Sequence, residues 1–150
     1  MRLTQLGNQM NDAHPIREIL KAKHVRPTEL RVSMLSQLFS AERPILLSDF
    51  RESFGEVPTS TLYRNLNLLE EFGFIERLNG ISGGVRFELT KAYLTPHHHI
   101  VCSICGSMLD IQISRDLEYG LSDALRECAG RLRYSYESFQ INLVGRCLRC

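Results

Sequence analysis

The sequence predicts an α+β fold built from two small parts, a winged helix followed by a small α/β unit. Three observations lead to this prediction. Apolar residues recur at helical spacing over residues 16–69, two strand-like runs flank a Gly-rich segment at 79–84, and a pair of cysteines stands at each end of residues 102–150. A chain of 150 residues has room for one ordinary domain or for two small ones.

The N-terminal part is expected to contain four short helices, with recognisable start and stop signals. Thr28 after Pro27 favours a helix start, because threonine caps free N–H groups and proline suits the first turn. Gly55 and Gly73 are typical of helix C-termini. The helices are expected at about residues 15–24, 28–42, 47–54 and 61–72.

A β-hairpin is expected to follow these helices. Residues 74–78 and 85–89 have the composition of strands, and the segment between them is rich in glycine. Helices followed by such a hairpin form a winged helix.

Beyond the hairpin, residues 91–96 are expected to form a linker to the second part. That part is expected to contain a strand with the histidines, a strand at about 108–113, a helix at about 115–129 and a last strand at about 139–144. We therefore expect one domain over residues 1–90, a hinge over 91–96 and a second domain over 97–150.

The composition is that of an ordinary globular chain, with 43% hydrophobic and 23% charged residues. A formal net charge of +1 neither demands nor excludes a nucleic-acid partner, because a basic patch can coexist with a neutral sum. No apolar run approaches the roughly 18–20 residues of a membrane span, and residues 1–12 lack the apolar stretch of a signal peptide. We expect a cytoplasmic protein with reduced thiols and no membrane partner.

Four of the five cysteines form two C-x-x-C pairs, Cys102 with Cys105 and Cys147 with Cys150. Two such turns offer the four sulfurs of a tetrahedral structural zinc site, which would clip the start of the second part to its end. A redox-active pair or two unrelated thiol pairs are the alternatives, but a redox C-x-x-C usually opens a helix. Cys128 continues an apolar helical series and is expected in the core.

Three consecutive histidines precede the first cysteine pair. On a strand, His97 and His99 point to one face and His98 to the other. Two imidazoles on one face suit a divalent metal such as Zn, Fe, Ni or Mn, and Glu88 and Asp110 are the carboxylates expected to complete the site. Such a site would bridge the two parts and set the angle between them. A solvated polar linker is the alternative.

Several motifs occur in order along the chain: Ser-Thr-Leu-Tyr-Arg-Asn-Leu at 60–66, Gly-Phe-Ile at 73–75, Phe-Glu-Leu-Thr at 87–90 and His-x-His-x-x-Cys-x-x-Cys-Gly at 97–106. Together with Thr28-x-x-Arg31, they resemble the ferric uptake regulator (Fur) family of bacterial metalloregulators over about residues 15–150. The resemblance implies an N-terminal winged-helix DNA-binding domain and a small α/β dimerisation domain with structural zinc. It also implies a homodimeric repressor, locked into its DNA-binding shape by a second, regulatory metal at the hinge.

The resemblance further assigns residues that contact double-stranded operator DNA. Tyr63 and Arg64 match the recognition-helix pair of the family, and an arginine can reach phosphate or guanine while a tyrosine can pack on a thymine methyl. Partial burial of Tyr63 and a solvated Arg31 are the alternatives. The candidate DNA contacts are Arg31, Ser60, Thr61, Tyr63, Arg64 and Asn67.

For the regulatory metal, the resemblance matches Glu88, His97, His99 and Asp110, with Glu76 and His98 as further candidates. The chain also departs from family patterns. Pro44 stands where many iron-responsive members place a hinge histidine, Thr90 where zinc-responsive members often have a cysteine, and Phe139 where some members have another histidine. The ligand set disfavours Cu(I) and leaves Fe(II), Zn(II) and Mn(II) open, together with peroxide sensing by iron-catalysed histidine oxidation.

Two other classes of protein are alternatives. A zinc enzyme keeps an open metal position, whereas the four-cysteine site is closed and the sequence contains neither H-E-x-x-H nor H-x-E…P-C-x-x-C, so we expect no enzyme. A zinc-stabilised protein-interaction module fits the neutral charge, but the Ser-Thr-Leu-Tyr-Arg helix with its wing favours DNA. Association beyond a dimer stays open.

Overall fold

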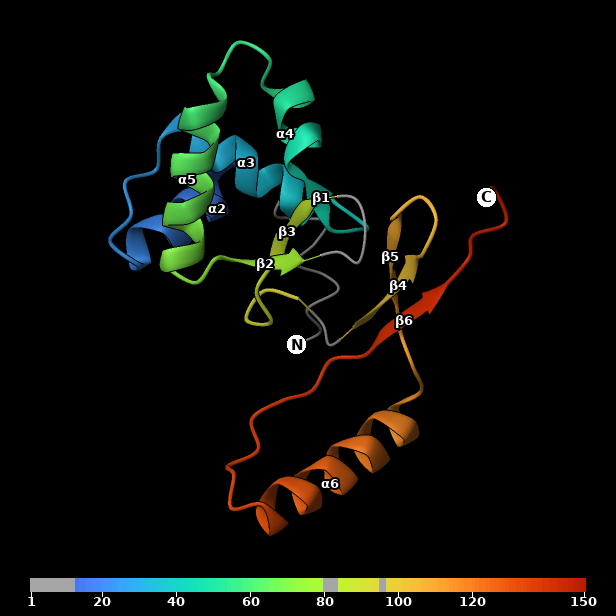
Figure 1. Cartoon of the computed structure of the whole chain (residues 1–150). Coiled ribbons are helices and arrows are strands. Elements are labelled where there is room, and N and C mark those ends of the chain that lie inside the picture. The colour runs from blue at the N-terminus through green and yellow to red at the C-terminus, as the bar shows by residue number, and fades with distance from the viewer. Residues whose placement is uncertain (1–12, 80–83, 95–96) are drawn as a thin grey trace.

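The computed structural model describes residues 13–79, 84–94 and 97–150. The expected α+β arrangement is confirmed, and two halves follow each other along the chain (Figure 1). The N-terminal half contains α2 (Ala13–Ala22), α3 (Glu29–Phe39), β1 (Ile45–Leu46), α4 (Leu47–Ser53), α5 (Thr59–Glu71), β2 (Ile75–Asn79) and β3 (Val85–Leu89). The C-terminal half contains β4 (His98–Cys102), β5 (Met108–Ile111), α6 (Arg115–Arg131) and β6 (Asn142–Gly145).

An apolar core fills the N-terminal half between its helices and an antiparallel sheet of strand order β1-β3-β2. Burying one large apolar side chain stabilises a fold by roughly 1.5–3 kcal/mol, so this half carries most of the hydrophobic stabilisation of the chain. The largest fully buried side chains are Ile16, Leu20, Met34, Leu35, Phe50, Leu62, Leu66, Leu69, Phe74, Ile75, Phe87 and Leu89.

Both ends of helix α5 are defined by local sequence. The helix begins at Thr59, slightly before the expected start, because the N-cap Pro58 already has a φ of −55° that suits a helix. It ends at a left-handed Gly73 (φ 66°), whose N–H donates to the Glu70 carbonyl, while the N–H of Phe74 donates to the carbonyl of Leu69. These two bonds set the direction in which the chain enters β2.

Strands β2 and β3 form the expected hairpin, with Glu76 directly opposite Glu88. The expected turn between them lies largely at 80–83, outside the described residues. Successive side chains of a strand point to opposite faces. Phe87 therefore enters the apolar core, whereas Arg86 and Glu88 are buried on the other face, toward the C-terminal half.

Strand β1 is an element that the sequence did not predict. It pairs with β3, and Ile45 lies opposite Phe87. Two residues are too few for a periodic signal. The last strand is also shorter than expected, because the N–H of Ile141 donates to the His98 ring instead of joining a strand ladder.

The expected linker is described only up to Leu94. Tyr93 and Leu94 pack against the N-terminal core, and the ring of Tyr93 stacks on Phe74 with centroids 6.2 Å apart. The first part of the linker therefore belongs physically to the N-terminal half.

The C-terminal half is built on a second sheet, of order β5-β4-β6, in which β4 runs antiparallel to β5 and parallel to β6. Helix α6 lies apart from the N-terminal helices (Figure 1). The Ser114 hydroxyl caps it by accepting a hydrogen bond from the Leu117 N–H at 3.4 Å. None of the residues of α6 is buried, and no described helix is long and apolar enough to cross a membrane.

The expectation that Cys128 lies in the core is wrong, because its side chain is exposed. Leu117 and Leu125, which belong to the same helical series, are exposed as well. The helical spacing correctly placed these residues on one apolar face of α6. It does not reveal whether residues of the same chain cover that face.

We predict that Gly73→Ala destabilises the chain by more than about 1 kcal/mol, because an L side chain is strained at a φ of 66°. Urea unfolding of the two proteins measures the difference. Gly55→Ala at the end of α4 is the matched control, since a Cβ there meets no atom closer than 3.8 Å. Equal losses of unfolding free energy in the two variants would contradict the role given to the left-handed backbone of Gly73.

Candidate functional site

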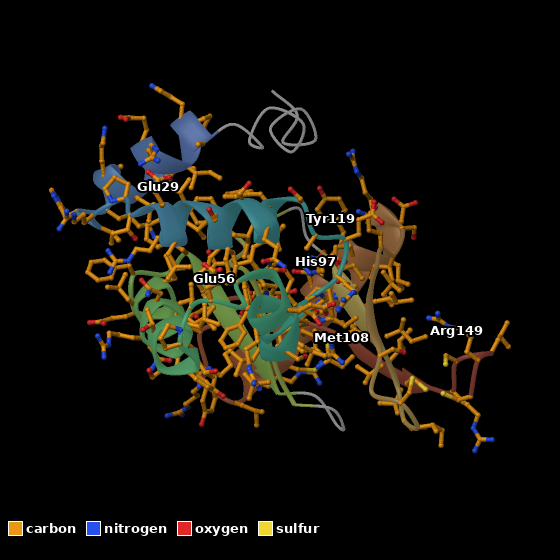
Figure 2. The ribbon with its side chains drawn as sticks, turned by 90° about the horizontal axis from the view of Figure 1, so that it is seen from above. Glu29, Glu56, His97, Met108, Tyr119 and Arg149 are labelled. Carbon is orange, nitrogen blue, oxygen red and sulfur yellow. The ribbon has the colours of Figure 1, made fainter. Side chains whose placement is uncertain are left out.

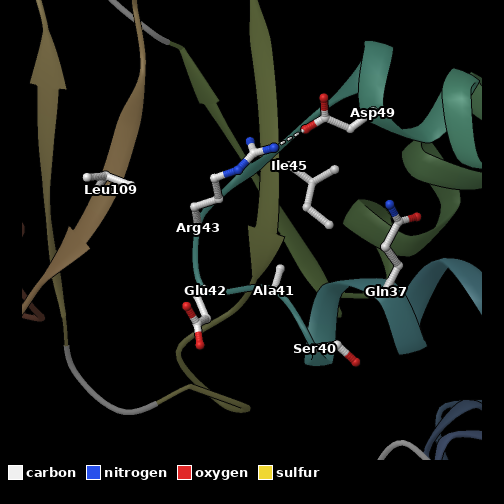
Figure 3. A pocket seen from close by; sticks show the side chains of 8 residues that line it. All are labelled: Gln37, Ser40, Ala41, Glu42, Arg43, Ile45, Asp49 and Leu109. Atoms are coloured by element: carbon white, nitrogen blue, oxygen red, sulfur yellow. Dashed lines mark ion pairs between the residues drawn. The ribbon is translucent and has the colours of Figure 1, made fainter. Parts of the chain in front are cut away.

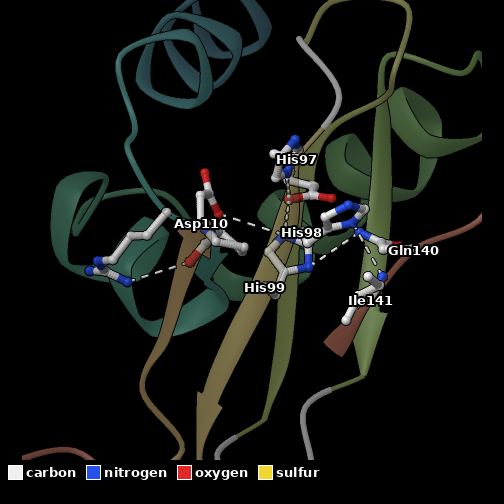
Figure 4. A network of polar contacts seen from close by, with 9 residues as sticks. His97, His98, His99, Asp110, Gln140 and Ile141 are labelled. Carbon is white, nitrogen blue, oxygen red and sulfur yellow. Dashed lines mark hydrogen bonds and ion pairs between the residues drawn. The ribbon is translucent and has the colours of Figure 1, made fainter. Parts of the chain in front are cut away.

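A cluster of two histidines and two carboxylates lies where the two halves meet (Figure 4). Glu88 Oε2 lies 3.2 Å from His97 Nε2 and 3.0 Å from His99 Nε2. Asp110 Oδ1 lies 3.6 Å from His99 Nε2. One ligand atom from each of the four residues falls within 4.8 Å of the others. We call Glu88, His97, His99 and Asp110 the hinge cluster.

Three strands position the hinge cluster. Glu88 comes from β3 of the N-terminal half, whereas His99 and Asp110 are paired neighbours on β4 and β5 of the C-terminal half. Figure 2 shows His97 between the N-terminal helices and the C-terminal strands. Because the ligand atoms come from both halves, a cation held here would join them.

The electrostatics of the hinge cluster suit a cation. Burial alone would raise the pKa of Glu88, but hydrogen bonds from His97 and His99 outweigh it and hold that pKa below its ordinary value. Burial raises the pKa of Asp110, and the charge of Glu88 raises it further, against the opposing effect of the histidines. Glu88 Oε1 is buried and, among the described residues, has no hydrogen-bond partner. An orphaned carboxylate oxygen beside two imidazoles fits a divalent metal.

A second layer of contacts orients the histidines. The amide nitrogen of Gln140 lies 3.2 Å from His99 Nδ1, on the side of the ring away from Glu88. Such a contact sets the ring orientation and leaves Nε2 directed at the cluster. The sequence did not identify Gln140, because its place depends on how the segment before β6 returns to β4.

The two further metal candidates lie outside the four-residue cluster. Glu76 of β2 lies directly opposite Glu88 and so borders the cluster, and burial, followed by the charge of Glu88, raises its pKa. His98 points to the opposite face of β4, as expected, where its Nε2 lies 2.9 Å from Glu118 Oε2. Its ring stacks on Phe139 with centroids 5.3 Å apart.

The four paired cysteines come together at the far end of the second sheet. Cys102 Sγ lies 3.8 Å from Cys150 Sγ, and Cys105 Sγ lies 3.9 Å from Cys147 Sγ. Sulfurs at about 2.3 Å from a zinc ion lie about 3.8 Å from one another in a tetrahedron. The donor set therefore fits a closed zinc site.

The thiols of this cluster are polarised unequally, and Cys102 is the one that most favours the thiolate form that binds metal. Backbone N–H groups of Cys105, Cys147 and Ile104 lower the pKa of Cys102 to about 6. Hydrogen bonding to the neighbouring cysteine sulfurs raises the pKa of Cys150 to about 12. Four adjacent thiolates would repel one another, and a zinc ion between them would supply the positive charge that they need.

The candidate DNA residues on α5 form an exposed face. Ser60, Arg64 and Asn67 are exposed, whereas Tyr63 is 40% exposed, so its side chain is partly buried, as the alternative expects, and still reaches the surface of this face. Thr61 is half-buried.

Arg31 has a different environment from the exposed α5 residues. Its Nε donates to Asn65 Oδ1 at 2.9 Å, and Asn65 in turn donates to the Thr61 carbonyl at 2.8 Å. Arg31 is therefore not simply solvated, because it ties α3 to α5.

A cleft of about 580 Å³ separates the two halves beside the hinge cluster (Figure 3). Arg43 and Asp49 form an ion pair of 3.0 Å on its N-terminal wall, and Leu109 of β5 faces them. Pro44, at the position discussed above for a hinge histidine, is buried behind this wall. Outside the cleft, Lys91 Nζ donates to the Ser138 hydroxyl at 3.2 Å, which is a further contact between the halves.

Comparisons with known proteins agree with this geometry. The model of the ferric uptake regulator family matches residues 22–133. The chain is 31% identical over 112 residues to the ferric uptake regulation protein of Bacillus subtilis (strain 168), covering 74% of this chain and 70% of that protein. It is 23% identical over 145 residues to the peroxide operon regulator of the same organism, covering 92% and 94% of the two chains.

A similar fold occurs among solved structures. The ferric uptake regulator of Helicobacter pylori, whose structure reveals three functional metal binding sites, matches with a TM-score of 0.69 at 22% identity. The match covers 91% of this chain and 89% of that chain.

We predict that Cys105→Ser lowers the zinc content well below about one ion per chain and destabilises the C-terminal half, because three thiolates no longer close the site. Metal analysis after gel filtration, with thermal unfolding, measures both effects. Cys128→Ser is the matched control, since Cys128 is exposed and outside the cluster. A Cys105→Ser protein with full zinc content and unchanged stability would refute the structural role.

Proposed function

The chain belongs to the ferric uptake regulator family of metal-dependent transcriptional regulators, which are not enzymes, and from this premise we propose that it is a metal-dependent repressor. It binds operator DNA as a homodimer when a divalent metal occupies the hinge cluster. The observation that carries the proposal is the position of Glu88. This residue of the wing strand β3 contacts two histidines that begin the C-terminal half.

The mechanism is a shift between orientations of the two halves. A divalent metal at the hinge cluster would supply a positive charge. One carboxylate from β3 and three residues of the C-terminal half would bind it together. Without it, Glu88 Oε1 is buried with no hydrogen-bond partner in the described part of the chain, and the halves sample several orientations. With it, one spacing of the two α5 helices in the dimer is favoured, and that spacing matches two half-sites on a pseudo-palindromic operator.

The ligand set narrows the choice of regulatory metal. Imidazole and carboxylate ligands suit Fe(II), Zn(II) and Mn(II) and disfavour the soft Cu(I). We propose Fe(II) or Zn(II) as the sensed metal, with Mn(II) as a third candidate. Peroxide sensing is the second candidate function, and the placement of His97 and His99 on one carboxylate supports it. An oxygen added to either histidine after peroxide treatment of the Fe(II) protein distinguishes it by mass.

Structural zinc is proposed for the four cysteines. Cys102 is the last residue of β4 and Cys105 lies in the turn after it, while Cys147 and Cys150 follow β6, so a closed zinc site clips the two neighbouring strands together. A small unit with little core of its own gains its folding energy from such a site. The thiols stay reduced in the cytoplasm, where we propose that the protein works.

Homodimerisation is proposed to cover the apolar surface of the C-terminal half. Tyr119, Leu132 and Tyr134 are each about 70% exposed (69%, 71% and 74%), and Leu143 and Val144 of β6 are exposed as well. Exposed apolar area of this kind marks an interface. Sedimentation velocity distinguishes a dimer from larger assemblies.

The DNA-facing surface is proposed to be the exposed face of α5 with its N-terminus. Arg64 and Tyr63 read the groove, and Ser60 and Thr61 lie near the phosphates. Asn67 accepts a hydrogen bond from Arg77 of β2 at 2.8 Å, which ties this face to the wing. Arg31 positions α5 through Asn65. This exposed polar face favours DNA over a module that binds protein only.

We expect operator affinity to rise by at least about tenfold when Fe(II), Zn(II) or Mn(II) is added to the zinc-loaded dimer. Fluorescence anisotropy at constant salt measures it, and the metal with the largest effect at the lowest free concentration is the sensed one. Glu88→Gln should abolish the response, whereas Glu56→Gln, at an exposed loop residue, should keep it. An operator affinity that neither added metal nor a chelator changes would contradict metal-dependent DNA binding.

We predict that Arg64→Ala weakens operator binding by roughly tenfold or more in the presence of the active metal, because a guanidinium contact to phosphate or guanine is lost. The same anisotropy titration measures it. Arg126→Ala is the control, since Arg126 is an exposed arginine on α6, remote from α5. Unchanged affinity in Arg64→Ala would remove this residue from the contacts.

A further inference from the structure

Arg86 is a buried charged residue that the proposed function does not use. Its side chain is 3% exposed, and its terminal NH2 donates to the carbonyl oxygen of Gly106. Gly106 directly follows Cys105 and has a left-handed φ of 68°, so its carbonyl belongs to the turn of the first cysteine pair. A residue of the wing strand therefore contacts the turn that carries the first cysteine pair.

Strand β3 is attached to the C-terminal half at two points. Arg86 and Glu88 point to the same face of β3, because they are two residues apart on a strand. Glu88 contacts His97 and His99 at the start of β4, and Arg86 contacts the turn that follows the end of β4. A single attachment would fix only the distance between β3 and the C-terminal half. Two attachments along the strand also restrict the rotation of β3 relative to that half.

The charge of Arg86 has no carboxylate partner in the described part of the chain. Asp49, the acidic group that acts on it electrostatically, is already paired with Arg43 at 3.0 Å. Arg86 Nε is buried, and no described residue accepts a hydrogen bond from it. Burial and the positive charge of Arg43 lower the pKa of Arg86. A buried guanidinium without a carboxylate partner is costly, and an anion nearby would lower that cost.

The four-cysteine site supplies that anion when it holds zinc. Four thiolates around one zinc ion leave a net charge of about −2. The Gly106 carbonyl that accepts the hydrogen bond from Arg86 directly follows Cys105, so the guanidinium lies beside this site. Zinc also fixes the turn that carries the Gly106 carbonyl, so loading the site strengthens the attachment of Arg86 to this turn.

We propose that Arg86 is the positioning residue through which zinc in the four-cysteine site holds strand β3, and with it Glu88, in place for the hinge cluster. This inference rests on the proposed function and deepens it. The two sites share no ligand, yet loss of zinc from the cysteines weakens metal binding at the hinge. The regulator then responds to the state of its thiols as well as to its regulatory metal.

Mn(II) binding to the zinc-loaded dimer tests the proposal. Mn(II) prefers oxygen and nitrogen ligands to thiolates, so the loss of its free electron paramagnetic resonance signal reports the hinge cluster alone. We expect Arg86→Met to weaken Mn(II) binding by roughly tenfold with zinc content unchanged. Arg86→Lys keeps the charge and one donor and should fall between Arg86→Met and the unaltered protein. Arg146→Met, at an exposed arginine beside Cys147, should bind normally.

Hydrogen exchange gives a second readout that does not depend on hinge metal. In Arg86→Met, the amides of β3 and of residues 103–107 should exchange several-fold faster, while those of α5 should keep their rates. If Arg86→Met does not fold, Arg86→Lys carries both measurements. Normal Mn(II) affinity with unchanged exchange in the Arg86 variants overturns the proposal. An unaltered protein that binds no Mn(II), Fe(II) or Zn(II) at the hinge overturns the proposed function instead, and exchange alone then decides the role of Arg86.

Discussion

The contact of Glu88 with His97 and His99 determines how the two halves of this chain relate to each other. One carboxylate oxygen lies 3.2 and 3.0 Å from the two imidazoles, while the other is buried without a described partner. A buried carboxylate is costly unless its oxygens are satisfied. The same atoms that hold the halves together are therefore the atoms that a divalent cation stabilises, and the family's metal dependence has a direct physical basis here.

The two halves differ in how much apolar core they contain, and this difference explains why bound metals would contribute strongly to the stability of the C-terminal half. The N-terminal half has a packed core, so α5 and its exposed face are presented on a rigid support. The C-terminal half has a small sheet and a helix without any buried residue. In the proposed function, a zinc ion between the two cysteine pairs and a second copy on the exposed apolar surface stabilise this half. Orientation can then change at the hinge without disturbing the DNA-facing helix.

Local signals in the sequence predicted most elements and the residues of both metal clusters. Helical spacing identified Leu62, Leu66 and Leu69, and strand alternation separated His98 from its two neighbours. Such local signals do not predict contacts between residues that are far apart in the sequence. The places of Gln140 and Arg86 depend on how β6 and β3 meet β4, although the two-residue spacing of Arg86 and Glu88 hinted at a shared face. Cys128 was misplaced because an apolar stripe does not reveal whether a partner or the same chain covers it.

The central claim is that one divalent metal joins β3 to the C-terminal half through the hinge cluster. Anomalous diffraction from crystals of the zinc-loaded dimer grown with the activating metal, at that metal's absorption edge, tests it most directly. We expect a peak at about 2.0–2.2 Å from a Glu88 oxygen and from nitrogens of His97 and His99 in every chain. A metal that activates DNA binding but gives its peak elsewhere, with no density at Glu88, would contradict it.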